Sequence, residues 1–213
     1  PNTRTMHRKE IITAGRPLEE ADRALIMIHG RGSSADDILS LAKYLHTSDC
    51  ALIAPQATNH MWYPYTFLAP PAENEPWLSS AIDLLKSVRD DLEEAGFSTD
   101  QLYWLGFSQG ACLTLEFVSR YATRYGGVVA FTGGLIGNKV YREHYKGNFA
   151  GTPVFLGTSD PDPHVPLERV EETAEVLTAM GAAVTKKVYR HMGHSINQDE
   201  IDTVNSLVFE AVK

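Results

Sequence analysis

Apolar, β-branched runs alternate with helix-period segments along the chain, and this alternation limits the fold more than any other feature. A strand, a helical crossover and a second strand place parallel strands side by side, so repeating the unit builds a mostly parallel sheet covered by helices. We expect strands at residues 8–14, 23–29, 51–54, 101–106, 127–132, 153–157 and 183–189. We expect helices at residues 35–47, 77–95, 108–125, 166–180 and 195–212. The pattern therefore predicts an α/β fold with helices on both faces of the sheet.

The connection between the first two predicted strands differs from the later ones. Residues 15–22 are too few for a helical crossover, so we expect these two strands to be antiparallel neighbours ahead of a parallel remainder. No linker rich in Gly, Ser or Pro divides the middle of the chain, and 213 residues are enough for one hydrophobic core. We therefore expect residues 1–213 to form a single domain.

Residues 58–76 fit neither the helical nor the strand period. The segment contains four prolines, and its aromatic side chains are Trp62, Tyr63, Tyr65 and Phe67. Structureless segments of this length are usually functional or disordered, and the aromatic content disfavours disorder. We interpret the segment as the wall or lid of a pocket lined by these four side chains. An aromatic flap that only covers the sheet edge is the alternative.

Charge and hydropathy disfavour several classes of partner. A formal net charge of −8 argues against nucleic acid and anionic membrane surfaces, because both are bound through basic patches. No apolar run is long enough to span a membrane, and the first residues lack the apolar core of a secretory signal. Cys50 and Cys112 have neither metal nor redox spacing. We expect a cytoplasmic protein with two reduced thiols, no cofactor and no metal; a precursor whose signal has been removed is the alternative.

The segment Gly106-Phe107-Ser108-Gln109-Gly110 lies between a predicted buried strand and a predicted helix. This is the context of a nucleophile elbow, in which a sharp strand-to-helix turn presents a serine hydroxyl above the carboxyl end of the sheet. The two glycines permit the strand and the helix to approach closely. We predict that Ser108 is a catalytic nucleophile for acyl transfer to water. An incidental serine in a glycine-rich turn is the alternative.

A second glycine-rich turn, His29-Gly30-Arg31-Gly32, follows an early predicted strand. A turn of this kind presents a backbone N–H to the nucleophile from the opposite side. We predict that the backbone N–H groups of Arg31 and Gln109 form an oxyanion hole, which stabilises a tetrahedral intermediate. A phosphate cradle is the alternative, but no Gly-Lys-Ser/Thr follows the turn, which disfavours a nucleotide-binding loop.

In folds with this elbow, the acid and then the histidine follow the nucleophile along the chain. Asp160 and Asp162 lie on a proline-framed loop after the strand expected at 153–157, and spacing does not separate them. His191 and His194 lie on the loop before the last helix. We predict that His194, beside a flexible glycine, is the general base and that His191 is packed or hydrogen-bonded. A zinc site at this His-x-x-His pair is disfavoured because no third ligand lies near it in the sequence.

Together these motifs resemble the phospholipase/carboxylesterase family, small α/β-hydrolases that include the acyl-protein thioesterases. The resemblance rests on His-Gly-Arg-Gly, Gly-Phe-Ser-Gln-Gly, Asp-Pro-x-Val-Pro and Gly-His, which follow one another from residue 29 to residue 194. It implies an α/β-hydrolase fold and a triad of Ser108, Asp162 and His194. It also implies oxyanion donation by the backbones of Arg31 and Gln109. The other aspartate of the loop is then a turn residue.

One position departs from the family's eukaryotic thioesterases, which usually carry leucine after His-Gly, where this chain has Arg31. The chain is more similar to a bacterial branch, some members of which are associated with quinone or aromatic-compound stress. We expect a carboxylesterase for small or medium esters, aromatic ones included, with His60 and His164 at the pocket. A thioesterase or lysophospholipase is the alternative within this chemistry, and a ligand-binding protein with lapsed catalysis is the alternative outside it. A homodimer is expected from the resemblance alone.

Overall fold

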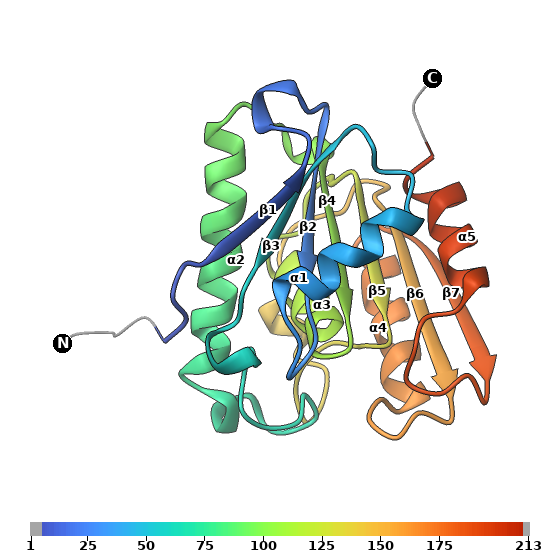
Figure 1. Ribbon diagram of the computed structural model, residues 1–213. Coiled ribbons are helices and arrows are strands. Elements are labelled where there is room, and N and C mark those ends of the chain that lie inside the picture. Colours follow the sequence, from blue (N-terminus) through green and yellow to red (C-terminus); the bar gives the residue numbers. More distant parts are fainter. Residues whose placement is uncertain (1–5, 211–213) are drawn as a thin grey trace.

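The computed structural model describes residues 6–210 of the chain. These residues form a seven-stranded sheet in the order β1-β3-β2-β4-β5-β6-β7 (Figure 1). All neighbouring strands are parallel except β1 and β3. The strands are β1 (Ile11–Gly15), β2 (Arg23–Ile28), β3 (Cys50–Pro55), β4 (Leu102–Phe107), β5 (Gly127–Phe131), β6 (Pro153–Asp160) and β7 (Ala183–Arg190). The predicted α/β fold with a mostly parallel sheet and an antiparallel first strand is confirmed.

The neighbour of β1 corrects one expectation. β1 runs antiparallel to the other strands, as predicted, but it pairs with β3 and not with β2. β3 lies between them because the chain returns from β2 to a parallel position on that side of the sheet. β1 and β2 are therefore two strand spacings apart, about 10 Å, and a short irregular connection is long enough to cover that distance. The connection length excluded a helical crossover but did not require adjacency.

Two groups of helices cover the two faces of the sheet (Figure 1). One face carries α2 (Trp77–Glu94), α3 (Gln109–Arg120) and α4 (Leu167–Ala179), and the other carries α1 (Ala35–Leu39) and α5 (Gln198–Leu207). Successive side chains of a strand point to opposite faces, so Leu25 and Ile26 of β2 belong to different hydrophobic clusters. Both faces of the central strands are therefore buried. No helix within residues 6–210 is long and apolar enough to cross a membrane.

Two predicted helices end earlier than expected. The helix predicted at 35–47 is α-helical only in α1 and continues as a 3-10 helix, Ser40–Tyr44. The first serine of that 3-10 helix donates its hydroxyl to a carbonyl of the preceding turn, which competes with α-helical bonding. The helix predicted at 108–125 ends with α3, because the N–H of Ala122 donates to the carbonyl of Lys146 in another loop. Tertiary hydrogen bonds replaced helical ones at that end.

The last helix also differs from the prediction of residues 195–212. It begins after Asn197, which caps the helix and forms a reciprocal capping box with Glu200. It ends at Leu207, and residues 211 and 212 of the prediction lie outside the described residues. The delayed start leaves the chain between β7 and α5 as a loop, and that loop carries one of the predicted catalytic residues.

The segment at residues 58–76 is folded by short turns and by one buried amide. Asn74 is buried, accepts a hydrogen bond from the N–H of Tyr65 at 2.7 Å and donates to the carbonyl of Thr66 at 3.0 Å. Two 3-10 turns, Thr58–His60 and Pro71–Asn74, bracket the aromatic residues. We refer to residues 61–68 as the aromatic wall. Its backbone is fixed by specific hydrogen bonds although it has no regular secondary structure.

Candidate active site

Ser108 lies at the turn between β4 and α3. Its backbone has φ 56° and ψ −120°, a conformation that costs energy for any residue other than glycine. A Cβ atom on Gly106 would lie 2.3 Å from the carbonyl oxygen of Gly110, and one on Gly110 would lie 2.1 Å from the carbonyl oxygen of Ile28. Both glycines are therefore required by the close approach of β2, β4 and α3. This packing holds the serine in its strained conformation.

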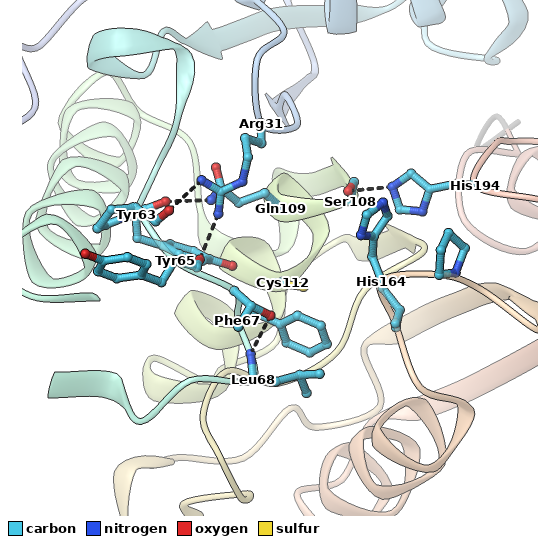
Figure 2. Close-up of a pocket in the computed structure, with 14 residues that line it drawn as sticks. Arg31, Tyr63, Tyr65, Phe67, Leu68, Ser108, Gln109, Cys112, His164 and His194 are labelled. Atoms are coloured by element: carbon cyan, nitrogen blue, oxygen red, sulfur yellow. Dashed lines mark hydrogen bonds between the residues drawn. The ribbon is translucent and has the colours of Figure 1, made fainter. Parts of the chain in front are cut away.

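The Ser108 hydroxyl meets His194, and His194 meets Asp162. Ser108 Oγ lies 2.7 Å from Nε2 of His194 (Figure 2), and Nδ1 of His194 lies 2.9 Å from Oδ2 of Asp162. The three residues follow β4, β6 and β7, and parallel strands end at the same edge of a sheet. In this geometry the His194 imidazole is within reach of the hydroxyl proton, and Asp162 orients the ring.

The structure distinguishes the two aspartates that spacing left equivalent. The Asp162 side chain is fully buried, and its Oδ1 accepts hydrogen bonds from the N–H groups of His164 at 2.7 Å and Val165 at 2.9 Å. Burial disfavours ionisation of Asp162, but the hydrogen bonds from His194 and these two N–H groups outweigh it and hold its pKa below the usual range. Asp160 is exposed at the end of β6. Asp162 is therefore the aspartate that contacts the histidine.

Aromatic contacts orient the His194 ring in addition to its two hydrogen bonds. Its centroid lies 5.3 Å from the Phe107 ring and 5.1 Å from the His164 ring, which it meets edge to face. Both nitrogens of His194 are engaged in hydrogen bonds, one to Ser108 and one to Asp162. His191 was expected to be packed or hydrogen-bonded. Its side chain is exposed, its backbone has φ 55°, and its backbone N–H donates to the Asp160 carbonyl.

The turn after β2 is anchored by His29, which is fully buried. Its Nε2 accepts a hydrogen bond from the N–H of Ala57 at 3.0 Å, and its Nδ1 lies 2.7 Å from the carbonyl of Gly30. Burial lowers the pKa of His29. A neutral ring with the proton on Nδ1 satisfies both contacts. His29 therefore has a structural role that fixes the path of the turn.

Of the two predicted oxyanion donors, Arg31 lies in the turn after β2 and Gln109 directly follows Ser108 in the chain. Gly30 packs closely on the elbow, since an added Cβ would lie 3.2 Å from the carbonyl oxygen of Phe107. Gln109 is the first residue of α3, so its N–H has no helical acceptor and lies at the positive end of the helix dipole. Figure 2 shows the side chains of Arg31 and Gln109 directed to the aromatic wall, away from His194.

A cavity of about 760 Å³ opens beside Ser108 and His194. Four of the predicted pocket residues line it, namely Tyr63, Tyr65, Phe67 and His164. Leu68, from the predicted wall segment 58–76, also lines it, together with Cys112, Pro163 and Val165, which were not predicted at the pocket. Cys112 follows Ser108 by four residues on α3, and this helical spacing was a usable signal because such residues share a face. Placing Pro163 and Val165 at the cavity required the path of the loop after β6.

Trp62 does not line this cavity, and that expectation is wrong. Its side chain is fully buried in the core, where Nε1 donates to the carbonyl of His29 at 2.8 Å. Its ring centroid lies 5.0 Å from that of His29. Burial of a large ring is favourable when its one polar atom has a partner, and the turn after β2 supplies that partner. His60 also lies outside the cavity, with Nδ1 2.7 Å from the Ser33 carbonyl.

A strained serine between a central parallel strand and a helix, with a histidine after the last strand, defines an α/β-hydrolase. The sequence profile of the family described as Phospholipase/Carboxylesterase matches residues 8–209. The chain therefore belongs to the phospholipase/carboxylesterase family, a family of hydrolases, and the resemblance seen in its motifs is confirmed.

Individual relatives agree with this assignment. A crystal structure of a phospholipase/carboxylesterase from Dyadobacter fermentans superposes with a TM-score of 0.96 at 49% identity, covering 98% of this chain and 100% of that one. Acyl-protein thioesterase 1 of Saccharomyces cerevisiae is 26% identical over 220 residues, which span 90% of this chain and 93% of the yeast protein. The Bacillus cereus carboxylesterase, at 21% identity and a TM-score of 0.75, covers 93% of this chain and 92% of its own and shares the fold.

Proposed function

We propose that this protein is a serine carboxylesterase that cleaves small to medium carboxylic esters, aromatic esters included, through an acyl-enzyme intermediate. The observation that carries the proposal is the continuous hydrogen-bonded chain from Ser108 through His194 to Asp162 at the edge of the cavity. Membership of a hydrolase family supports the same class of reaction.

Acylation follows from the positions of these three side chains. His194 Nε2 removes the Ser108 proton as Oγ attacks the ester carbonyl carbon, and a tetrahedral oxyanion forms. When the intermediate collapses, the protonated imidazole gives that proton to the leaving alcohol. The Asp162 carboxylate accepts from Nδ1 throughout, which keeps Nε2 available and stabilises the imidazolium. The acyl group is then bound to Ser108 as an ester.

Deacylation repeats these steps with water as the nucleophile. His194 removes a proton from a water molecule at the position that the alcohol has left, and the resulting hydroxide attacks the acyl carbon. The second tetrahedral intermediate releases the carboxylic acid, and His194 returns the proton to Ser108 Oγ. In both steps we assign the oxyanion to the backbone N–H groups of Arg31 and Gln109. Loss of one such donor typically raises the barrier by about 3–4 kcal/mol.

The lining of the cavity supports the proposed class of substrate. Aromatic and aliphatic side chains form most of its surface, among them Tyr65, Phe67 and Leu68, and its volume of about 760 Å³ suits a small molecule. Flat aromatic walls favour an aromatic acyl or alcohol group, because offset stacking adds to the gain from burial. No described residue that lines the cavity is Asp or Glu, so neither a neutral nor an anionic ester would lie against a carboxylate there.

A p-nitrophenyl ester series from acetate to palmitate, with matched acyl thioesters, tests this function. We expect the highest kcat/KM for acetate, butyrate or benzoate, and loss of turnover with Ser108→Ala. A preference for long acyl chains or for thioesters would support the thioesterase or lysophospholipase alternative, which the yeast relative also raises. A fluorophosphonate probe that fails to label Ser108 in folded protein would instead support a ligand-binding protein without catalysis.

We further propose that the protein acts in the cytoplasm. Its two cysteines, Cys50 and Cys112, are both free and buried, and burial raises the pKa of each thiol to about 12. Thiols that are far apart and unreactive are typical of a reducing compartment. Fractionation of native cells with an antibody to this chain tests the location, and recovery in a secreted or membrane fraction would contradict it.

A further inference from the structure

The backbone N–H groups of Arg31 and Gln109 are proposed to bind the oxyanion, whereas their side chains hydrogen-bond to the aromatic wall. Arg31 Nη1 donates to the carbonyl of Pro64 at 3.0 Å, and its Nη2 donates to the carbonyl of Tyr65 at 2.8 Å. The guanidinium also lies 5.9 Å from the centroid of the Tyr63 ring. Hydrogen bonds from a charged donor are stronger than neutral ones, so Arg31 holds two successive carbonyls of the aromatic wall.

Gln109 holds the residues just before these. Its Oε1 accepts a hydrogen bond from the N–H of Trp62 at 2.8 Å, and its Nε2 donates to the carbonyl of Tyr63 at 2.9 Å. Gln109 is only 6% exposed, so both hydrogen bonds are shielded from water. Figure 2 shows the two side chains converging on the wall from the turn after β2 and from α3. Four consecutive residues, 62–65, are therefore bonded to the two residues predicted to donate to the oxyanion.

The geometry points to a positioning role for both side chains. By bonding to the aromatic wall, they fix the Gly30–Arg31 and Ser108–Gln109 peptide planes, whose N–H groups donate hydrogen bonds to the oxyanion. This inference rests on the proposed function and adds a specific coupling to it. In this arrangement the aromatic wall is a fixed part of the catalytic machinery, not a mobile lid, and the pocket and the oxyanion hole share one hydrogen-bond network.

The local backbone explains why Arg31 needs such a restraint. The turn places glycine on both sides of Arg31, and Gly32 has φ +78° with open space around its Cα. Glycine gives the chain rotational freedom, so sterics alone do not fix the direction of the Arg31 peptide. The Gly32 N–H donates to the carbonyl of His60, which ties the same turn to the residue just before the wall. Small displacements of catalytic groups cost up to about a hundredfold in rate, so a restraint of this kind affects turnover directly.

The test compares Arg31→Leu and Gln109→Met with matched controls. Both substitutions keep the backbone N–H and remove the hydrogen bonds to the wall. Arg16→Leu removes an arginine that bonds a loop carbonyl, that of Ser48, away from the site. Gln101→Met removes an amide just before β4 that, like the Gln109 amide, accepts from one backbone N–H and donates to one carbonyl. Its partners are the N–H of Ser98 and the carbonyl of Asp22, which precedes β2. The controls therefore lose the same kinds of bond without touching the wall.

We expect kcat for p-nitrophenyl butyrate to fall roughly tenfold to a hundredfold in Arg31→Leu and in Gln109→Met. KM should change less than about threefold, since the apolar lining is retained. The inhibition constant of a trifluoromethyl ketone, which forms a tetrahedral oxyanion on Ser108, should rise in parallel with the loss of kcat. The double variant should lose less than the product of the two single losses, because both act through one network. Arg16→Leu and Gln101→Met should stay within about twofold of the parent.

The possible results test the positioning role and the proposed esterase activity separately. Unchanged kcat and unchanged ketone inhibition in both variants would overturn the positioning role while leaving the esterase intact. A rise in KM alone would also overturn it, since the side chains would then only shape the pocket. Failure of the unsubstituted protein to hydrolyse any ester or to react with fluorophosphonate would overturn the proposed function itself. If Arg31→Leu does not fold, Arg31→Lys serves, because it keeps the charge but not the two-carbonyl contact, and an unchanged kcat in that variant would contradict the inference.

Discussion

Ser108 Oγ and His194 Nε2 lie 2.7 Å apart although 86 positions separate the two residues in the sequence. The contact exists because β4 and β7 end at the same edge of the sheet, with β5 and β6 between them. In the proposed mechanism, the reactivity of Ser108 therefore depends on a loop near the far end of the chain.

Replacement of the nucleophile is the first prediction. Ser108→Ala should lower kcat for p-nitrophenyl butyrate at least about a thousandfold, because the covalent intermediate cannot form. Adding His194→Ala to it should cause little further loss, since the pair acts as one unit. Steady-state kinetics and fluorophosphonate labelling measure both effects. Ser40→Ala, on an exposed serine, is the control. Retention of labelling in Ser108→Ala would identify another serine as the nucleophile.

The two aspartates of the β6 loop are expected to behave differently. Asp162→Asn should reduce kcat by about a thousandfold or more, because the amide cannot stabilise the imidazolium and favours the wrong ring tautomer. Asp160→Asn should stay within about threefold, since this side chain is exposed. Matched kinetics of the two variants, with circular dichroism to check the fold, decide the matter. A larger loss in Asp160→Asn would contradict the assignment of the acid.

Trp62 and Tyr65 are expected to separate stability from substrate binding. Trp62 is fully buried, so Trp62→Ala should lower the free energy of unfolding by about 3–5 kcal/mol. Tyr65 is 60% exposed at the cavity, so Tyr65→Ala should leave unfolding nearly unchanged and raise KM for aromatic esters several-fold. Urea titration and ester kinetics measure the two quantities. An equal loss of stability in both variants would show that Tyr65 is part of the core.

Glu200 is expected to make the stability of the protein depend on pH. The residue is fully buried beneath the Cα of Gly157, and burial raises its pKa to about 7 from 4.5. Between these two values the folded protein holds a proton that the unfolded chain has lost. The free energy of unfolding therefore falls as pH rises from about 4.5 to 7, by about 3 kcal/mol for this group.

The variant Glu200→Gln isolates that contribution. Gln keeps a side-chain oxygen for the N–H of Asn197, and its backbone N–H still donates to Asn197 Oδ1, so the capping box retains both of its bonds. We expect the stability difference between Glu200→Gln and the parent to grow in favour of the variant across this pH range. Urea titrations at four or five pH values between 4 and 8 measure it. Parallel pH profiles would show that Glu200 titrates with an ordinary pKa.

Local sequence was sufficient for the elements around Ser108. A buried apolar strand, glycines two residues on either side of the serine and a following helix are adjacent in the chain, and the structure contains all of them. The partner strand of β1 was not predictable in this way, because the 15–22 connection is compatible with adjacency or with one strand between. The crossover from β2 to β3 placed β3 between β2 and β1, which gave β1 its partner strand.

The site shows the same division. The loop after β6 was identifiable from Asp-Pro-x-Val-Pro, and the family resemblance favoured Asp162, but spacing by itself did not separate the two aspartates. The structure shows Asp162 fully buried beside two N–H groups and Asp160 exposed. The aromatic wall was identifiable from composition, yet Trp62 turned out to serve the core and not the pocket. Its direction depends on the His29 carbonyl, which lies 33 positions earlier.

By itself, the sequence determined the strand and helix order, the elbow and the chemical type of each candidate residue, because periodicity, glycine placement and motif order are local properties of the chain. The tertiary structure alone decided which strand borders β1 and which aromatic rings face the cavity. It also decided that Arg31 and Gln109 bond to the aromatic wall. These outcomes depend on contacts between distant segments, whose energies are realised only when the sheet has brought those segments together.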